Sequence, residues 1–88
     1  MSEETRFTGG EIVRLRRDHP EDSLVSCECG LIWGVYDHDP ILYEASFVDK
    51  SGKFVDMRFY EEEVEEVRNP EEVLHIDRLE ELRRMLER

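Results

Sequence analysis

Every hydrophobic run in this sequence is short, because charged or turn-forming residues interrupt it within a few positions. No window approaches the roughly 18 consecutive apolar residues that a membrane-spanning helix needs. Several runs instead alternate apolar and polar residues, which is typical of half-buried β-strands. The chain has 88 residues, enough for one small core but not for two independent ones. These features predict a single domain over residues 1–88 that is mainly β.

Five segments have the pattern of strands. Residues 11–16 place Val13 and Leu15 on one side of an extended chain, and residues 24–36 are apolar, β-branched and aromatic. Gly30 and Gly34 within the second segment predict a bulge or a sharp bend. Residues 41–48 and 54–60 flank a turn ending in Gly52, so they predict a hairpin. Residues 64–67 predict a short last strand, and the acidic stretch around them a solvated turn or edge.

The end of the chain predicts an amphipathic helix within residues 70–88. Leu79, Leu82 and Leu86 recur at positions i, i+3 and i+7, with Met85 beside them. Two starts compete. Residues 69–72 combine a capping asparagine with a proline in the first turn, whereas a helix from about residue 77 would begin with a capping box.

About five short strands suit a small barrel, and three segments carry a family resemblance. They are Gly10-Glu11-Ile12-Val13-Arg14-Leu15, Gly30-Leu31-Ile32-Trp33-Gly34-Val35, and Tyr43-Glu44-Ala45-Ser46-Phe47-Val48-Asp49 with Gly52. In these segments the chain resembles the small bacterial SH3-like barrel proteins of unknown function, which are distantly similar to the barrel of the nitrile hydratase β subunit. The resemblance implies a five-stranded SH3-like barrel over residues 7–67, followed by the C-terminal helix.

The resemblance supplies a fold and little function, since SH3-like barrels serve peptide binding, nucleic-acid binding and subunit packing alike. It carries over no catalytic residue. It implies a role as an immunity or antitoxin partner of a toxic enzyme. The sequence departs from the family at Trp33, where a small or polar residue is usual, and in the appended helix, so these two features are candidates for the specificity of this chain.

Charge narrows the class of partner. There are 23 acidic and 12 basic residues, which gives a formal net charge of −11. Such an excess opposes binding to nucleic acids and to anionic membrane surfaces, because both depend on Lys and Arg. Three clustered arginines, Arg14, Arg16 and Arg17, are interpreted as ion-pair partners of nearby acids rather than as an RNA contact.

The ends and the cysteines bear on localisation. The first four residues, Met1-Ser2-Glu3-Glu4, include two acids and no base, whereas a secretory signal would begin with basic residues followed by an apolar stretch. The cytoplasm is therefore the expected compartment. Cys27 and Cys29 are two positions apart, which suits reduced thiols better than a disulfide. On a strand they would share one face, so a metal or redox site there is kept as a third hypothesis, although the second paired element of a structural zinc site is missing.

No local motif indicates catalysis. The sequence has no phosphate-binding glycine loop, and its many carboxylates are uninformative at this acid content. We therefore expect a protein that is not an enzyme and that requires no cofactor or metal.

The leading hypothesis is a non-enzymatic, acidic module that binds a basic protein, with immunity or antitoxin inhibition as its concrete form. Most aromatic residues are expected in the core, with Tyr36 and Tyr60 the more exposed pair. The alternative is a structural homo-oligomer or an enzyme accessory subunit. The candidate partner-binding residues are Trp33, Tyr36, Tyr60, Glu61, Glu62, Glu63, Glu65 and Glu66, and the candidate oligomer contact is Leu79, Leu82, Met85 and Leu86.

Overall fold

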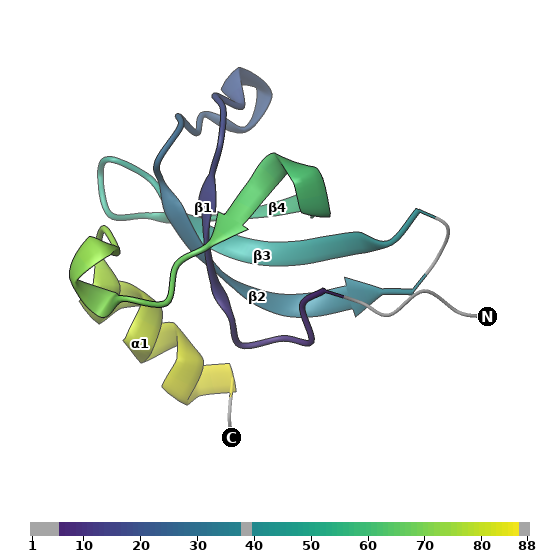
Figure 1. Ribbon diagram of the computed structural model, residues 1–88. Helices are drawn as coiled ribbons and strands as arrows, with labels where there is room; N and C mark the ends of the chain where they lie inside the picture. Colours follow the sequence, from purple (N-terminus) through teal and green to yellow (C-terminus); the bar gives the residue numbers. More distant parts are fainter. Residues whose placement is uncertain (1–5, 38–39, 87–88) are drawn as a thin grey trace.

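A computed structural model describes residues 6–37 and 40–86, which form one five-stranded antiparallel sheet and a C-terminal helix (Figure 1). The strands are β1 (Ile12–Leu15), β2 (Cys29–Tyr36), β3 (Leu42–Val48), β4 (Phe54–Tyr60) and β5 (Val64–Glu66), and the helix is α1 (Ile76–Leu86). Three 3-10 turns, η1 (Pro20–Asp22), η2 (Glu61–Glu63) and η3 (Pro70–Glu72), lie between them. The mainly β prediction with a C-terminal helix is confirmed.

The strand order is β4-β3-β2-β1-β5, so β4 and β5 are the two edges of the sheet. No pairing joins these edges within the described residues, and the sheet is open between them. Strand β1 lies between β2 and β5, and its Val13 is opposite Gly30 of β2 and Glu66 of β5. The short last strand predicted over residues 64–67 is therefore present as an edge strand.

Strand β2 contains the irregularity that its glycines predict. Its register against β3 shifts between Ile32 and Gly34, which leaves Trp33 as the extra residue of a bulge. Gly30 is required for a different reason. A β-carbon at this position would lie 2.7 Å from the ring of Phe47 and 2.9 Å from the carbonyl oxygen of Ser46.

The predicted strand over residues 24–36 is wrong in its first part, since β2 begins only at Cys29. His19 and Leu24 exchange backbone hydrogen bonds of 2.8 and 3.1 Å and so close a loop around η1. Ser23 and Cys27 have left-handed backbones, with φ of 59° and 73°, and these two positions interrupt an extended path.

The two faces of the sheet pack differently. The inner face is built around the buried Tyr43, whose ring lies 5.2 Å from that of Phe7 and 5.8 Å from that of Phe59. On the opposite, outer face, Leu79 and Leu82 of α1 pack against a cluster that includes Ile12 and Leu31. Figure 1 shows α1 to one side of the twisted sheet, with the far ends of β2 and β3 extending away from it. Much of the outer face of β2, β3 and β4 is thus left without a helix over it.

The helix begins at Ile76, close to the second of the two predicted starts. The first start opens only the η3 turn, where the Asn69 side chain accepts a hydrogen bond from the backbone N–H of Glu71. His75 then takes a left-handed backbone, with φ of 58°, directly before the helix. The predicted range extended to residue 88, but residues 87–88 lie outside the described part. Among the described residues, no helix is long and apolar enough to cross a membrane.

Candidate protein-binding surface

The exposed part of the outer face carries aromatic and charged side chains in three cross-strand rows. We call this surface the aromatic face. Strand register places Asp56 opposite Ser46, Arg58 opposite Glu44, and Tyr60 and Tyr36 on either side of Leu42. Its members are Trp33, Tyr36, Leu42, Glu44, Ser46, Asp56, Arg58 and Tyr60.

A chain of hydrogen bonds holds Trp33 on this face. The indole Nε1–H of Trp33 donates to Ser46 Oγ at 3.0 Å, and the Ser46 hydroxyl donates to Asp56 Oδ1 at 2.5 Å. The Trp33 side chain is nevertheless 39% exposed. An indole that is fixed at its polar end and is still partly exposed is a preorganised contact, since its rotamer entropy is already lost.

A second chain fixes Tyr36. Its hydroxyl donates to Glu44 Oε1 at 2.6 Å, and Arg58 lies over the Tyr36 ring with its guanidinium carbon 5.6 Å from the ring centre. The hydrogen bond to the Glu44 carboxylate raises the pKa of the Tyr36 hydroxyl above its ordinary value. The nearest approach of Arg58 to Glu44 is a contact of 3.8 Å. Gly34 leaves room for this arrangement, because a β-carbon there would lie 3.2 Å from that of Glu44.

All three aromatic residues that the sequence proposed for partner binding lie on this one face. Tyr36 and Tyr60 were expected to be the more exposed pair. Tyr60 is 41% exposed, but the expectation is wrong for Tyr36, which its contacts partly bury, and Trp33 is exposed instead. Sequence reasoning missed the polar members Glu44, Ser46 and Arg58 as site residues. The alternation of β4, which gives it one partly polar face, was the available signal, but Glu44 and Ser46 can be assigned to the face only from the register of β3.

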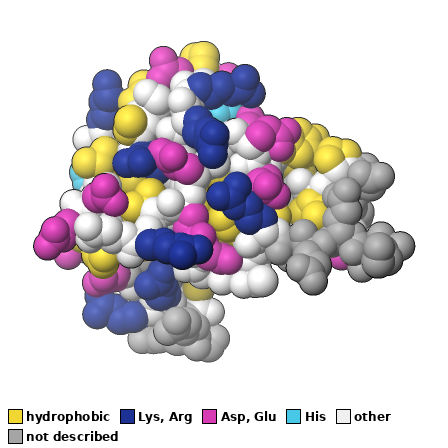
Figure 2. Space-filling model, in the orientation of Figure 1, with side chains coloured by type: hydrophobic (Ala, Val, Ile, Leu, Met, Phe, Trp, Pro, Cys, Tyr) yellow, Lys and Arg dark blue, Asp and Glu magenta, His cyan; other side chains and the backbone are white. Residues whose placement is uncertain are grey.

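The acidic run of residues 61–66 is largely compensated by arginines. Glu65 lies 2.6 Å from Arg14 Nη2, and Glu63 lies 3.1 Å from Arg17 Nη2. The further pairs are Arg6–Glu61 and Arg68–Glu66, each at 3.6 Å. Among the described residues, Glu62 is the one acid of the run without a cationic partner. Figure 2 shows basic and acidic side chains interspersed on the face that β1 and β5 present.

Two of the three clustered arginines are therefore ion-pair partners, as the sequence indicated. The Glu65 carboxylate raises the pKa of Arg14 through a side-chain hydrogen bond of 2.8 Å, against the opposing effect of burial. Arg16 instead donates from Nε to the carbonyl oxygen of Val64 at 3.1 Å. The acidic run thus contributes to the pairing of β1 with β5 and presents less free negative charge than its sequence suggests.

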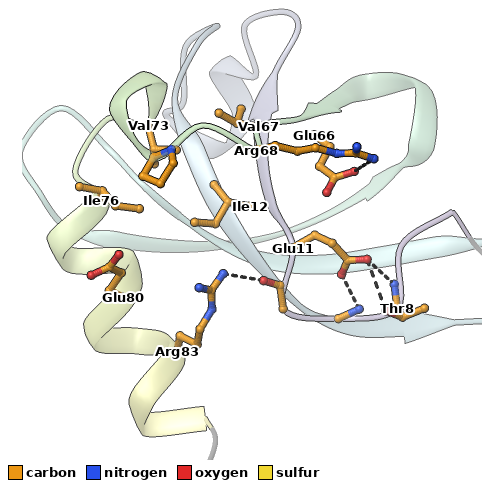
Figure 3. A pocket seen from close by; sticks show the side chains of 13 residues that line it. Thr8, Glu11, Ile12, Glu66, Val67, Arg68, Val73, Ile76, Glu80 and Arg83 are labelled. Atoms are coloured by element: carbon orange, nitrogen blue, oxygen red, sulfur yellow. Dashed lines mark hydrogen bonds and ion pairs between the residues drawn. The ribbon is translucent and has the colours of Figure 1, made fainter.

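A groove of about 710 Å³ lies between α1 and the start of β1 (Figure 3). Ile12, Val67, Val73 and Ile76 contribute its apolar lining. At one side Arg83 donates to the carbonyl oxygen of Gly10 at 2.7 Å, which connects the helix to the glycine turn. At the same turn the Glu11 carboxylate accepts the backbone N–H groups of Thr8 and Gly9 at 2.8 and 2.7 Å. The charged side chains at this end of the groove thus have structural partners.

The four residues proposed as an oligomer contact divide into two pairs. Leu79 and Leu82 are buried against the chain's own sheet, whereas Met85 and Leu86 are 56% and 49% exposed. A smaller cavity of about 370 Å³ lies between Leu86 and Trp33, with Leu31 and the glycine turn as its other walls. The accessible part of the proposed contact is therefore the last turn of α1.

The two cysteines do not share a face. Cys27 lies before β2 and is exposed, whereas Cys29 is buried against the helix and donates weakly to the Cys27 carbonyl oxygen at 3.7 Å. Burial raises the pKa of the Cys29 thiol, which makes it a poor nucleophile and a poor metal ligand. This geometry favours two separate free thiols over a joint site.

One group of potential metal ligands comes together in residues 6–37 and 40–86. It consists of His19, Glu21 and Asp22, whose donor atoms lie within 4.8 Å of one another at the η1 turn. His19 is buried, and its Nε2 faces Glu63 Oε1 at 3.8 Å without a hydrogen bond. The group contains neither cysteine, so it gives no support to a metal site at Cys27 and Cys29.

Comparison with known proteins adds no assignment to this geometry. No protein-family model, no curated protein and no solved structure matches the chain.

Proposed function

We propose that this chain is a non-enzymatic protein-binding module that engages its partner through the aromatic face. The observation that carries the proposal is the pair of exposed aromatic side chains, Trp33 and Tyr60, on a sheet face that the fold leaves uncovered. The exposure of these two rings is not needed for folding, so it indicates a role in binding. Large aromatic side chains held in place beside polar groups are the residues that dominate protein–protein interfaces.

The arrangement favours binding over catalysis. The polar members of the face are engaged with one another, as in the chain from Trp33 through Ser46 to Asp56. A catalytic site would instead need a nucleophile or base aimed at a space for substrate. We therefore keep the expectation that the protein is not an enzyme and needs no cofactor.

The finer fold is part of the proposal. A β1 that pairs with both β2 and β5, and a 3-10 turn between β4 and β5, support an SH3-like barrel whose inner face holds the aromatic core. The resemblance noted from the sequence implies the same fold. The relationship to the nitrile hydratase β subunit barrel stays within this proposal.

The net charge of −11 favours a basic partner. Because the acids of residues 61–66 are mostly paired, the attraction would come from acids elsewhere. Glu71, Glu72, Asp77 and Glu80 are exposed around the start of α1. Inhibition of a toxic basic enzyme, as an immunity or antitoxin protein in the cytoplasm, is the concrete form of this proposal.

The test is capture of partners from the native host by the tagged chain at moderate and at high salt. Mass spectrometry identifies the proteins that are retained. Trp33→Ala combined with Tyr60→Ala removes the two exposed rings. Leu74→Ala is the matched control, because Leu74 is 51% exposed and lies outside the aromatic face. We expect one basic partner that the control retains and that the double variant loses.

Retention of the same partner by the double variant would exclude the aromatic face as the binding surface. A partner whose retention does not change with salt would remove the electrostatic part of the proposal. Reversal of Glu62, Glu63 and Glu66 tests the acidic run separately. We expect a smaller effect from Glu63 and Glu66 than from an unpaired acid, because their charges are already compensated.

A second candidate function is a structural homo-oligomer or an enzyme accessory subunit. Met85 and Leu86, exposed at the end of α1, favour it. Replacement of both by Ser would abolish such a contact without disturbing Leu79 and Leu82. Light scattering of the variant and the native chain over a range of concentrations measures the outcome.

A further inference from the structure

Strand β4 presents an unpaired edge. It is seven residues long and lies at the end of the sheet, and no other described strand pairs with its far side. A long free edge is a template for pairing with another chain unless its side chains prevent it. The side chains exposed along β4 are Asp56, Arg58 and Tyr60, so the question is whether their charges block the edge or select a partner.

The hydrogen bonds of the β3–β4 hairpin fix which backbone groups are free. Asp49 N–H donates to the carbonyl oxygen of Lys53 at 2.9 Å. Because hydrogen-bonded pairs alternate along an antiparallel ladder, Val55, Met57 and Phe59 bond to β3. The backbone groups of Phe54, Asp56, Arg58 and Tyr60 therefore point outward. Consistently, Tyr60 N–H is taken by the Glu63 carboxylate at 2.6 Å rather than by β3.

The sequence of β4, Phe-Val-Asp-Met-Arg-Phe-Tyr, is self-complementary about its middle residue. If two copies pair antiparallel around a two-fold axis at Met57, Asp56 of each copy lies opposite Arg58 of the other. Phe54 then lies opposite Tyr60, and all seven residues overlap. Because the Tyr60 N–H is bonded to Glu63, the backbone hydrogen bonds between the copies come chiefly from the two Asp56–Arg58 pairs. Opposite charges and aromatic pairs at directly opposed positions stabilise a sheet.

The neighbouring registers that use the same outward backbone groups are unfavourable. An axis at Asp56 places two aspartates opposite each other, and an axis at Arg58 places two arginines opposite each other. Like charges at directly opposed positions destabilise the pairing. The charge pattern therefore selects one register out of three.

The two charged side chains are available for this pairing. Ser46 bonds to Oδ1 of Asp56, which leaves Oδ2 for a second partner. The Arg58 side chain lies over the Tyr36 ring and 3.8 Å from Glu44, but it is 64% exposed and has further N–H groups to donate. We propose that the chain forms a homodimer in which two β4 strands pair antiparallel about Met57 and extend the sheet across both copies.

The test measures mass by sedimentation over a range of concentrations for the full chain and four variants. Arg58→Asp and Asp56→Arg each place like charges opposite each other, and the double swap Asp56→Arg with Arg58→Asp restores opposite charges. Arg84→Asp, at an exposed position on α1, is the control for the same change of charge. We expect the single swaps to weaken dimerisation by about tenfold or more, and the double swap and the control to retain it.

A native chain that stays at the monomer mass of 10.5 kDa at every concentration would overturn the proposal. So would a dimer that the single swaps leave intact, since it would use another surface. If a swap unfolds the chain, hydrogen exchange of the native protein tests the proposal instead. The Asp56 and Arg58 amides should become more protected as concentration rises, while the Phe59 amide, already bonded to β3, should not change. No change at Asp56 and Arg58 would overturn the proposal.

Discussion

At the scale of single residues, the two cysteines should differ sharply in reactivity. Cys27 is exposed, whereas Cys29 is buried and its thiol pKa is raised by that burial. Because the thiolate is the reactive form, we expect an alkylating reagent to label one thiol of the folded protein at neutral pH. Mass spectrometry of the time course measures this.

Two variants identify which thiol is labelled in the folded protein. Cys27→Ser should remove this labelling, and Cys29→Ser should leave it unchanged. The second thiol should react only after unfolding in denaturant. Equal rates for both thiols in the folded protein would contradict the burial of Cys29.

Asp49 gives a residue-scale prediction about pH. Its Oδ1 accepts hydrogen bonds from Ser51 N, Ser51 Oγ and Lys53 N at 2.8, 2.6 and 3.0 Å, and the bond from the Ser51 hydroxyl is the largest cause of its lowered pKa. The folded pKa thus lies below the ordinary value of about 3.9. The contribution of Asp49 to stability is present above that value and is lost as pH falls through the folded pKa.

We therefore expect Asp49→Ala to lower the thermal midpoint at neutral pH, and the difference from the native chain to shrink in strong acid. Ser51→Ala should have a smaller effect, because it removes one of the three hydrogen bonds. Thermal denaturation followed by circular dichroism across pH provides the measurement. A difference that grows as the pH falls would contradict this sign.

At the scale of elements, the pairing of β2 with β3 depends on Gly30. A β-carbon there would collide with the ring of Phe47 and the carbonyl of Ser46. Overpacking of this kind costs about 1–3 kcal/mol, so Gly30→Ala should reduce the free energy of unfolding by that amount. Chemical denaturation measures it. Gly34→Ala is the milder comparison, since its closest contact is 3.2 Å, and an equal loss in both variants would point to a cause other than crowding.

The attachment of α1 to the sheet gives the second element-scale prediction. Leu79 is fully buried, while Leu86 on the same helix is 49% exposed. Leu79→Ala should cost about 2–5 kcal/mol through lost burial and a cavity. Leu86→Ala should change the free energy of unfolding by about 0.5 kcal/mol or less. Similar losses of unfolding free energy in the two variants would mean that another side of the helix packs against the sheet.

The same elements explain how far the sequence could predict the structure. Strand alternation is a local property, so β1, β3, β4 and the hairpin turn follow from it. Local patterns do not reveal that Ser23 and Cys27 adopt left-handed backbones, and the start of β2 was placed too early for that reason. The bulge could be predicted from its glycines, but the side to which Trp33 points depends on Ser46 in another strand.

The candidate site shows the same limit more strongly. The acidic run could be identified from the sequence, but its neutralisation could not be quantified, because Arg14 and Glu65 meet only through the pairing of β1 with β5. Trp33, Tyr36 and Tyr60 were candidate binding residues, although Trp33 rather than Tyr36 is exposed with Tyr60. Their polar neighbours Glu44 and Ser46 were not, since only the register of β3 brings them beside Tyr36 and Trp33.

At the scale of the whole molecule, the two proposals concern one continuous surface. Pairing of two β4 strands about a two-fold axis perpendicular to the sheet would place the aromatic faces of both copies on the same side. Tyr60 of each copy would then lie at the seam, opposite Phe54 of the other. A partner bound across the seam would have a stoichiometry of one per dimer, whereas a partner bound beside Trp33 would bind each copy. Dissociation of the dimer by dilution should weaken only the first kind of binding.

The overall charge leads to the last prediction. Four arginines compensate four acids of residues 61–66, yet the chain retains a formal net charge of −11. Exposed ion pairs contribute only about 0–1 kcal/mol each, while self-repulsion of a charge far from zero destabilises the compact state. Salt screens both the ion pairs and the self-repulsion, and we expect the loss of self-repulsion to dominate.

The thermal midpoint at low micromolar concentration should therefore rise between about 0.02 and about 0.3 M NaCl. Glu62→Lys, which removes the unpaired acid of the run, should raise the midpoint at low salt and flatten its dependence on NaCl. A midpoint that falls with salt would mean that the arginine–glutamate pairs along β1 and β5 outweigh the repulsion.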